Sequence, residues 1–380
     1  MAFNSVAWLL WMWLTVGLYW LAPREARLWL LAALTVAFLV ALSPLSAAIL
    51  SGFTIVVLLV ARRPTLTGVQ AVATAGALAV VLMAFKVKLA WEGGLAAGAY
   101  LLPLGISYYS FRCIHVVIER YRGLLPPVTP RDLVGYLFFL PTIVTGPIHR
   151  MDDWLHDERR QRFDPTLLSE GAERILYGYG KIVILGNWLV GGQMGEAIAA
   201  LPDQEGPLAT YLRIAQYGLN LYFQFSGYSD IAIGFARMLG YRVMENFNWP
   251  YLQPNISAFW RSWHISLSQW CRDYLYGPVV SLTRAPAVGV MTVMIVFGIW
   301  HEITLRFLLW GAWHGVGLVV WQWWDRHGPP LPEGLPGWAR GGVHALKVLA
   351  TVNFVWFSFV LLDAPTVLGA LDVFARFLPF

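Results

Sequence analysis

Long hydrophobic runs alternate with short polar stretches along the whole chain. A helix needs roughly 20 apolar residues to cross the hydrocarbon core of a bilayer, which is about 30 Å thick. The pattern predicts apolar helices, some of them too short to cross fully, at 5–22, 28–43, 45–61, 66–85, 95–119, 172–192, 208–240, 286–301, 305–325, 343–361 and 364–378. We therefore expect an all-α, polytopic membrane protein.

The polar stretches between these runs are short. Those at 150–165, 201–207 and 326–342 are the longest, and none of them is long enough to bury a hydrophobic core of its own. Arg24 and Arg27 follow the first apolar run. Because loops on the cytoplasmic side carry an excess of arginine and lysine, we expect this loop in the cytoplasm and the N-terminus outside.

Two segments do not fit a simple crossing. Residues 136–148 are apolar but are interrupted by Pro141, Gly146 and Pro147, which predicts a re-entrant segment. Broken backbone is tolerated at membrane depth only where protein or a cavity surrounds it. The second segment, 258–276, is an apolar run interrupted by Arg261, His264, Arg272 and Asp273, so we expect it to face a polar cavity or to lie at the membrane interface as an amphipathic helix.

Composition agrees with a membrane location. Hydrophobic residues make up 58% of the chain and charged residues only 13%, whereas soluble domains carry about 25% charged residues. The net charge of +5 arises from basic residues between apolar runs, and no nucleic-acid-binding motif is visible. Cys113 and Cys271 define neither a disulfide framework nor a metal site, so we expect each to be a small buried apolar residue.

Three histidines lie inside or at the end of apolar sequence: His264, His301 and His314. Intramembrane ionisable residues are candidates for function, and imidazole accepts and returns a proton near neutral pH. On one continuous helix His301 and His314 would lie about 20 Å apart, and a break after His301 would remove that limit. A purely structural role stays open for each of the three.

Other polar residues have simpler interpretations. The sequence after His301 is not a zinc-protease motif, because Leu305 stands where the second histidine is required, and we expect no metal site. Asp230 and Arg237 lie seven residues apart, on nearly the same helical face. We interpret them as a structural ion pair.

Several blocks of sequence appear in an order that resembles the membrane-bound O-acyltransferase family, in particular its bacterial branch. They are LPLGISYYSF at 102–111, FFLPTIVTGPI at 138–148, FSGYSDIAIG at 225–234, ENFNWPY at 245–251, FWRSWHISLS at 259–268, RDYLY at 272–276, GIWH at 298–301 and WGAWHG at 310–315. This branch includes alginate O-acetylation proteins and teichoic-acid D-alanyl transfer proteins. The resemblance covers roughly residues 100–325.

The resemblance implies a fold and an arrangement of domains. The fold is a ring of tilted transmembrane helices around a central funnel with re-entrant or broken helices. It implies N-terminal transmembrane helices at 1–95, a catalytic core at 96–325 and a C-terminal loop with transmembrane helices at 326–380. The family's catalytic histidine falls on His301, and its second position falls on His264.

The blocks around these histidines supply further candidates for substrate binding or for the lining of the funnel. They are Trp260, Arg261, Trp263, Ser266, Asp273, Trp300, Glu302 and His314. Two departures from the branch stand out: Glu302 where glycine usually follows the catalytic histidine, and Leu362-Asp363 where alginate-type members often have Phe-Arg. The first implies a narrower and more acidic pocket beside the catalytic histidine, and the second weakens the assignment to the alginate subgroup.

The function that the resemblance implies is acyl transfer in the bacterial inner membrane. A thioester donor on the cytoplasmic side, acetyl-CoA or an acyl carrier protein, would supply an acyl group, acetyl first, with no bound cofactor. The acceptor would be a hydroxyl of a cell-surface polysaccharide or of a periplasmic partner protein, and we expect such a partner because the chain has no nucleophile elbow. The alternatives are D-alanyl transfer to a teichoic-acid-type polymer, a proton-coupled transporter that uses the same histidines, and a non-catalytic docking subunit.

Overall fold

A computed structural model describes residues 5–91, 103–125, 128–330 and 334–378. These residues form helices joined by loops, with no strand among them, which confirms the all-α prediction. The chain divides into two compact units: Met1–Gly180 with Gly227–Glu245, and Lys181–Ser226 with Asn246–Phe380. The long helix α10 (Pro207–Met238) contributes its first part to the second unit and its last part to the first.

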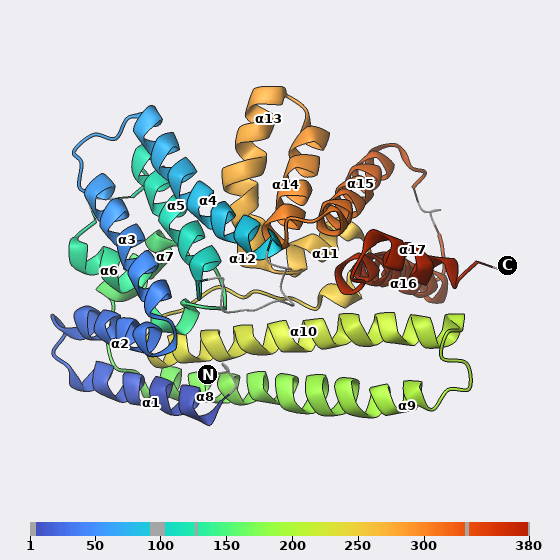
Figure 1. Ribbon diagram of the computed structural model, residues 1–380, viewed down its shortest axis with the longest axis horizontal. Coiled ribbons are helices and arrows are strands. Elements are labelled where there is room, and N and C mark those ends of the chain that lie inside the picture. The colour runs from blue at the N-terminus through green and yellow to red at the C-terminus, as the bar shows by residue number, and fades with distance from the viewer. Residues whose placement is uncertain (1–4, 92–102, 126–127, 331–333, 379–380) are drawn as a thin grey trace. The chain divides into compact units, whose positions relative to one another are not determined.

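The first unit is built from the predicted N-terminal helices and the segments that follow them. Its helices are α1 (Val6–Leu21), α2 (Arg27–Leu42), α3 (Pro44–Ala61), α4 (Gly68–Trp91), α5 (Ile106–Arg122), α6 (Pro130–Leu137), α7 (Met151–Arg159) and α8 (Pro165–Tyr179), together with the end of α10. Local sequence explains several starts: Ser43 caps α3, whose first residue is Pro44, a favoured first helical position. Helices α3, α4 and α5 pack side by side (Figure 1).

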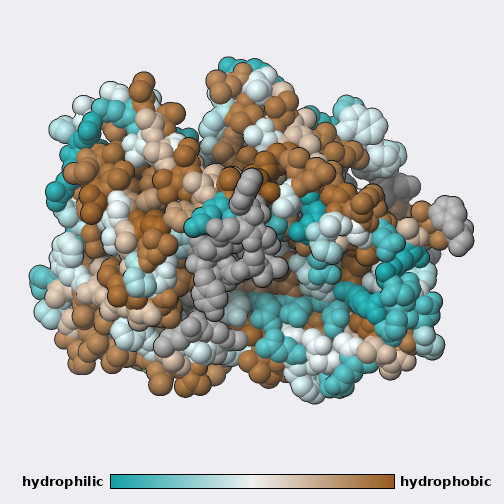
Figure 2. Space-filling view, viewed as in Figure 1, coloured by the Kyte–Doolittle hydropathy of each residue, from teal (hydrophilic) through white to brown (hydrophobic). Residues whose placement is uncertain are grey.

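Several helices expose apolar side chains. Ile55 and Leu59 on α3, and Val69 and Val72 on α4, are more than half exposed, and Figure 2 shows hydrophobic side chains over this region. Four helical stretches are long and apolar enough to cross a membrane: Pro44–Ala61, Gly68–Lys88, Pro165–Ala199 and Gly337–Asp363. The described residues also contain three shorter apolar helices, α1, α2 and α14 (Pro286–His301). With several apolar helices of this kind, the chain is a multi-pass membrane protein.

The segment predicted to be broken, 136–148, does not form a crossing helix. Helix α6 ends at Leu137, a single 3₁₀ turn follows at Leu140–Thr142, and irregular backbone with bends at 143–146 then leads to α7. Its apolar side chains are buried, including Phe139 and Ile143, which have no exposed surface. Irregular backbone surrounded by protein in this way is the condition under which a membrane protein tolerates it.

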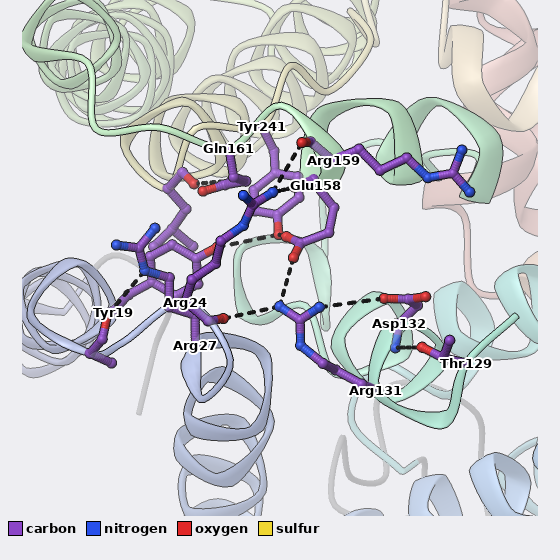
Figure 3. A network of polar contacts seen from close by, with 12 residues as sticks. Tyr19, Arg24, Arg27, Thr129, Arg131, Asp132, Glu158, Arg159, Gln161 and Tyr241 are labelled. Carbon is purple, nitrogen blue, oxygen red and sulfur yellow. Dashed lines mark hydrogen bonds and ion pairs between the residues drawn. The ribbon is translucent and has the colours of Figure 1, made fainter.

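A polar network at the end of the first unit involves the buried carboxylate of Glu158 (Figure 3). This carboxylate accepts hydrogen bonds from the Tyr241 hydroxyl and, at 2.9 Å, from Arg131. Arg131 also donates to the backbone oxygen of Arg24, at the start of the loop between α1 and α2. A buried charge needs such partners, because an unpaired carboxylate away from water is strongly destabilising.

The second unit contains the remaining helices. The π-helical stretch Gly180–Met194 continues α8, and all of it except Gly180 belongs to this unit. The other elements are α9 (Gly195–Ala199), the first part of α10, α11 (Ile256–Ser262), α12 (Ile265–Cys271), the π-helical turn Arg272–Tyr276, α13 (Gly277–Thr283), α14, α15 (Leu305–His327), α16 (Gly337–Asp363) and α17 (Val367–Ala375). Cys271 here, and Cys113 in the first unit, are buried and free, as predicted.

Helices α14 and α15 form an antiparallel hairpin with close backbone contact. A Cβ atom on Gly298 would lie 2.1 Å from the backbone oxygen of Phe307, and one on Gly311 would lie 2.3 Å from that of Met294. A Cβ atom essentially never lies this close to a heavy atom to which it is not bonded, so only glycine fits at either position without a shift of the backbone. The hairpin therefore depends on the small residues that precede His301 and His314 in sequence.

Candidate active site

The predicted 258–276 segment is two short helices, α11 and α12, separated by a sharp break at Trp263 and His264. His264 has φ of +44°, in the left-handed region that residues with a Cβ adopt rarely. Two backbone hydrogen bonds stabilise the break: Asn248 N–H donates to Ser262 O, and Ile265 N–H donates to Asn246 O, both at 2.9 Å. We call these paired segments, 246–248 and 262–266, the clasp.

Asn246 determines which nitrogen of His264 carries the proton. Its side-chain oxygen lies 3.4 Å from the backbone nitrogen of Ser266, which only donates, and 3.0 Å from the Ser266 hydroxyl. The atom that faces these donors must be the amide oxygen, so His264 Nδ1, 3.1 Å away, is a donor as well. The lone pair of the neutral ring is therefore on Nε2.

His264 is buried among aromatic rings, an environment that favours the neutral form of its imidazole. The ring of Phe225, on α10, meets it edge-on with centroids 4.8 Å apart. His264 lies in the break between two short helices, outside the membrane-spanning helices. Burial lowers its pKa, and the nearby His301 imidazole lowers it further. The two histidines that the sequence singled out therefore interact electrostatically.

His301 is the last residue of α14, and the helix does not continue beyond it. Glu302 has extended backbone and its N–H donates to Gly298 O, after which α15 begins at Leu305. The break considered in the sequence analysis is thus present. The His301 ring is half-buried, with the Trp300 ring 4.6 Å away and the Trp310 ring meeting it edge-on at 5.6 Å.

His314 occupies a buried position on α15, and α16 fixes its tautomer. Ser358 donates its hydroxyl proton to Val355 O at 2.6 Å, so its oxygen accepts from His314 Nε2, 2.9 Å away. The lone pair of the His314 ring is therefore on Nδ1. The Trp310 ring lies between His314, at 4.9 Å, and His301, at 5.6 Å.

The other predicted site residues fall into two groups. Trp260 packs edge-on against His314 at 5.2 Å, and Ser266 and Trp263 belong to the clasp, so these three are buried close to the histidines. Arg261 is exposed and donates to Ser257, and Asp273 is paired with the exposed Arg272 at 3.0 Å. Glu302, by contrast, is buried beside His301, with its carboxylate 3.7 Å from Arg306.

The expected ion pair between Asp230 and Arg237 is wrong. Asp230 instead pairs with Arg174 on α8 at 2.7 Å, and Arg237 pairs with Glu170 on the same helix at 3.4 Å. Seven residues along a helix correspond to about 10 Å, which is too far for a direct contact. Each charge therefore finds its partner on the neighbouring helix.

Sequence reasoning missed four residues that shape these sites: Asn246, Arg174, Arg306 and Ser358. Arg174 is the only arginine or lysine of α8, and an arginine in such a helix signals an ion pair. Asn246 lies in the block that begins at Glu245, but an uncharged amide gives no comparable signal. Arg306 and Ser358 owe their roles to contacts between helices, which the order of residues in one chain does not reveal.

Comparison with known proteins identifies the family. The sequence profile of MBOAT, the membrane-bound O-acyltransferase family, matches residues 106–329, which include His264, His301 and His314. The chain is 36% identical over 220 residues to the probable alginate O-acetylase AlgI of Pseudomonas aeruginosa, covering 55% of this chain and 41% of that protein. It is 26% identical over 255 residues to the peptidoglycan O-acetyltransferase of Helicobacter pylori, covering 59% and 48%.

A third relative carries a different acyl group in its name. The teichoic acid D-alanyltransferase of Streptococcus thermophilus is 29% identical over 287 residues, covering 68% of this chain and 67% of that protein. The alignment with the alginate O-acetylase, by contrast, spans about two fifths of that longer relative. The family profile covers more than half of the sequence and encloses the clasp and the α14–α15 hairpin, so the chain belongs to the membrane-bound O-acyltransferase family.

Proposed function

We propose that this chain is an O-acyltransferase of the bacterial inner membrane, which transfers an acyl group, acetyl first, to a hydroxyl of a cell-surface polysaccharide. The donor is a thioester on the cytoplasmic side, acetyl-CoA or an acyl carrier protein, and no bound cofactor takes part. Family membership and the relatives named for O-acetylation of alginate and peptidoglycan support this proposal.

The observation that carries it is the placement of two imidazoles on separate elements of the second unit: His264 is buried in the clasp with its lone pair on Nε2, and His301 is half-buried at the end of α14. In the proposed reaction His301 takes the proton of the acceptor hydroxyl while that oxygen attacks the thioester carbonyl carbon. The ester C–O bond forms, the C–S bond breaks, and the proton passes to the departing thiolate. His264 orients or polarises one of the reacting groups.

The acceptor reaches His301 from the outer side in this proposal, through the funnel that the family resemblance implies. A periplasmic partner protein presents the polysaccharide or relays the acyl group to it. Trp300 and Trp310 support the proposal, because bulky rings beside the half-buried His301 exclude water that would otherwise hydrolyse the thioester.

D-Alanyl transfer is a second candidate, and one observation favours it. The alignment with the Streptococcus thermophilus D-alanyltransferase covers 68% of this chain, against 55% for the Pseudomonas aeruginosa alginate relative. The proton transfer at His301 is the same for either acyl group. The two functions differ in donor and in the group found on the polymer.

Inside-out membrane vesicles from cells that express the chain test the function. We expect radiolabel from acetyl-CoA, added on the exposed cytoplasmic face, to appear in polymer as ester that mild hydroxylamine releases as acetyl hydroxamate. If polymer is labelled only when radiolabelled D-alanine is supplied with its ligase and its carrier protein, the transferred group is D-alanyl and not acetyl. No ester from either donor, with the chain folded in the vesicles, would contradict acyl transfer.

Replacing Asn246 by leucine should lower turnover about 10²-fold, the loss that an ångström of misplacement of a reacting group can cause. Leucine removes the oxygen that holds His264 Nδ1–H, so the ring is free to rotate and to change tautomer. Asn246→Asp keeps an oxygen there and should restore part of the rate. Its negative charge raises the pKa of His264, so the acidic limb of the pH–rate profile should move to higher pH.

Rates across pH on purified variants, normalised to folded protein, provide the measurement. If Asn246 is merely structural, Asn246→Leu and Asn246→Asp should both lower the yield of folded protein, and the folded protein that remains should have the pH–rate profile of the wild type. That result would remove Asn246 from the proposed mechanism, without affecting His301.

A further inference from the structure

A cavity of about 110 Å³ lies in the second unit between the first turns of α10, the end of α16 and α17. One water needs roughly 10–15 Å³ measured in this way, so the cavity has room for a group much larger than water. Charged side chains from three elements line it: Arg213 on α10, Asp363 at the end of α16, and Arg376 just after α17. The family profile ends at residue 329, so two of these three lie outside it.

Three polar groups of residues that line the cavity have no hydrogen-bond or ion-pair partner among the described residues: the Asp363 carboxylate, the Tyr217 hydroxyl and the Thr210 hydroxyl. Arg213 donates to the backbone and side-chain oxygens of Gln204, both uncharged. An exposed carboxylate and two hydroxyls without partners on one small cavity are groups that a ligand can satisfy.

The chemistry of these groups selects the ligand. A carboxylate only accepts hydrogen bonds, so the ligand must donate to Asp363. Arg376 is already paired with Glu205 and Asp372, and Arg306 at the rim of the cavity is paired with Glu302. One cation, Arg213, then remains against one anion, Asp363, with no excess of positive charge to attract a phosphate or carboxylate. The ligand is therefore a neutral group rich in hydroxyls.

The remaining wall is apolar and partly aromatic. The rings of Tyr217 and Phe359 lie 5.8 Å apart, and Ile214 and Val360 complete this side. A sugar ring combines an apolar C–H face with a rim of hydroxyls, and it matches a cavity with one apolar wall and a few polar groups. We infer that this cavity is a carbohydrate-binding subsite, which holds a neutral sugar unit of the acceptor through Asp363 and Tyr217.

Arg306 connects this subsite to His301. Its guanidinium donates to the backbone oxygens of Leu361, Leu362 and Ala364 at the rim of the cavity, and it lies 3.7 Å from the carboxylate of Glu302, the residue after His301. The two departures noted in the sequence, Glu302 and Asp363, thus flank one cation. The inference rests on the proposed function for its link to catalysis, but sugar binding itself does not require acyl transfer.

Saturation-transfer NMR on the full chain in nanodiscs tests the subsite. Nanodiscs avoid alkyl glycoside detergents, whose sugar headgroups would compete. We expect at least one of glucose, galactose and mannose to bind in the millimolar range or tighter, glucuronate to bind more weakly, and glycerol 3-phosphate not to bind. Tyr217→Phe and Asp363→Asn should each raise the dissociation constant about 3–10-fold, the value of one hydrogen bond.

The matched control is Tyr211→Phe, on the same helix. The Tyr211 hydroxyl donates to Asn353, away from the cavity, so sugar binding should not change in this variant. No binding of any neutral sugar, tighter binding of glucuronate or glycerol 3-phosphate, or an unchanged dissociation constant in Tyr217→Phe would each overturn the inference. His301→Ala should bind sugar like the wild type, so loss of acyl transfer and loss of the subsite remain distinguishable.

Discussion

Replacing His301 by alanine should lower acyl transfer about 10²–10⁴-fold, the contribution that a general base typically makes. The ring is at the end of α14, half-buried beside Trp300 and Trp310, and its imidazole lies near enough to lower the pKa of His264. Mass spectrometry of the ester content of the surface polymer, together with the rate in vesicles, provides the measurement.

His344→Ala is the matched control. This histidine is exposed on α16, away from the hairpin end, and its loss should leave both rate and folding unchanged. The thermal unfolding of His301→Ala should resemble that of the wild type, because a half-buried ring at a helix end contributes little packing. An unchanged ester content in a folded His301→Ala protein would remove this histidine from the chemistry and leave only the family assignment.

Replacing Gly298 by alanine should destabilise the protein by about 3 kcal/mol or more, at the upper end of what overpacking in a core costs. The new Cβ would lie 2.1 Å from the backbone oxygen of Phe307 and 2.9 Å from its carbonyl carbon. Backbone atoms cannot rotate away as a flexible side chain does, so α14 and α15 must separate. His301 follows three residues later and would move with its helix, so activity should fall with stability.

Gly342→Ala provides the comparison within the same unit. Gly342 lies on α16 with nothing within 4 Å of the added Cβ, and alanine there should be neutral or stabilising by about 0.4–1 kcal/mol. Thermal unfolding in nanodiscs and the rate in vesicles should be compared for both variants. Equal melting temperatures for Gly298→Ala and the wild type would show that the hairpin accommodates the new Cβ without loss of stability, which would contradict the expected clash with the backbone of Phe307.

The hydrophobic pattern predicted the long helices well, because their ends follow from local sequence. The predicted 45–61 helix is α3, whose start is set by Ser43 and Pro44, and the predicted 286–301 helix matches α14 at both ends. The predicted 95–119 helix corresponds to α5 from Ile106 onward, and its residues up to 102 lie outside the described residues. The predicted domain limits and the funnel stay predictions.

The candidate site was harder to predict, since its details depend on partners far apart in sequence. Histidine inside apolar sequence singled out His264, His301 and His314, and their catalytic roles stay predictions. Nothing in the sequence indicates that His264 adopts left-handed backbone, because that conformation is stabilised by hydrogen bonds to the 246–248 segment. A partner distant in sequence also explains why Arg237 was wrongly predicted to pair with Asp230, because the arginine that does so, Arg174, belongs to another helix.

The clasp also has a consequence for biosynthesis. His264 and Asn246 are only 18 residues apart, and both precede α14 in the chain. Synthesis proceeds from the N-terminus, at about 5–20 residues per second, so every group of the clasp is translated before His301. The groups that hold the imidazole of His264 in its tautomer are therefore made first, and insertion of the α14–α15 hairpin should be the step that completes the candidate site.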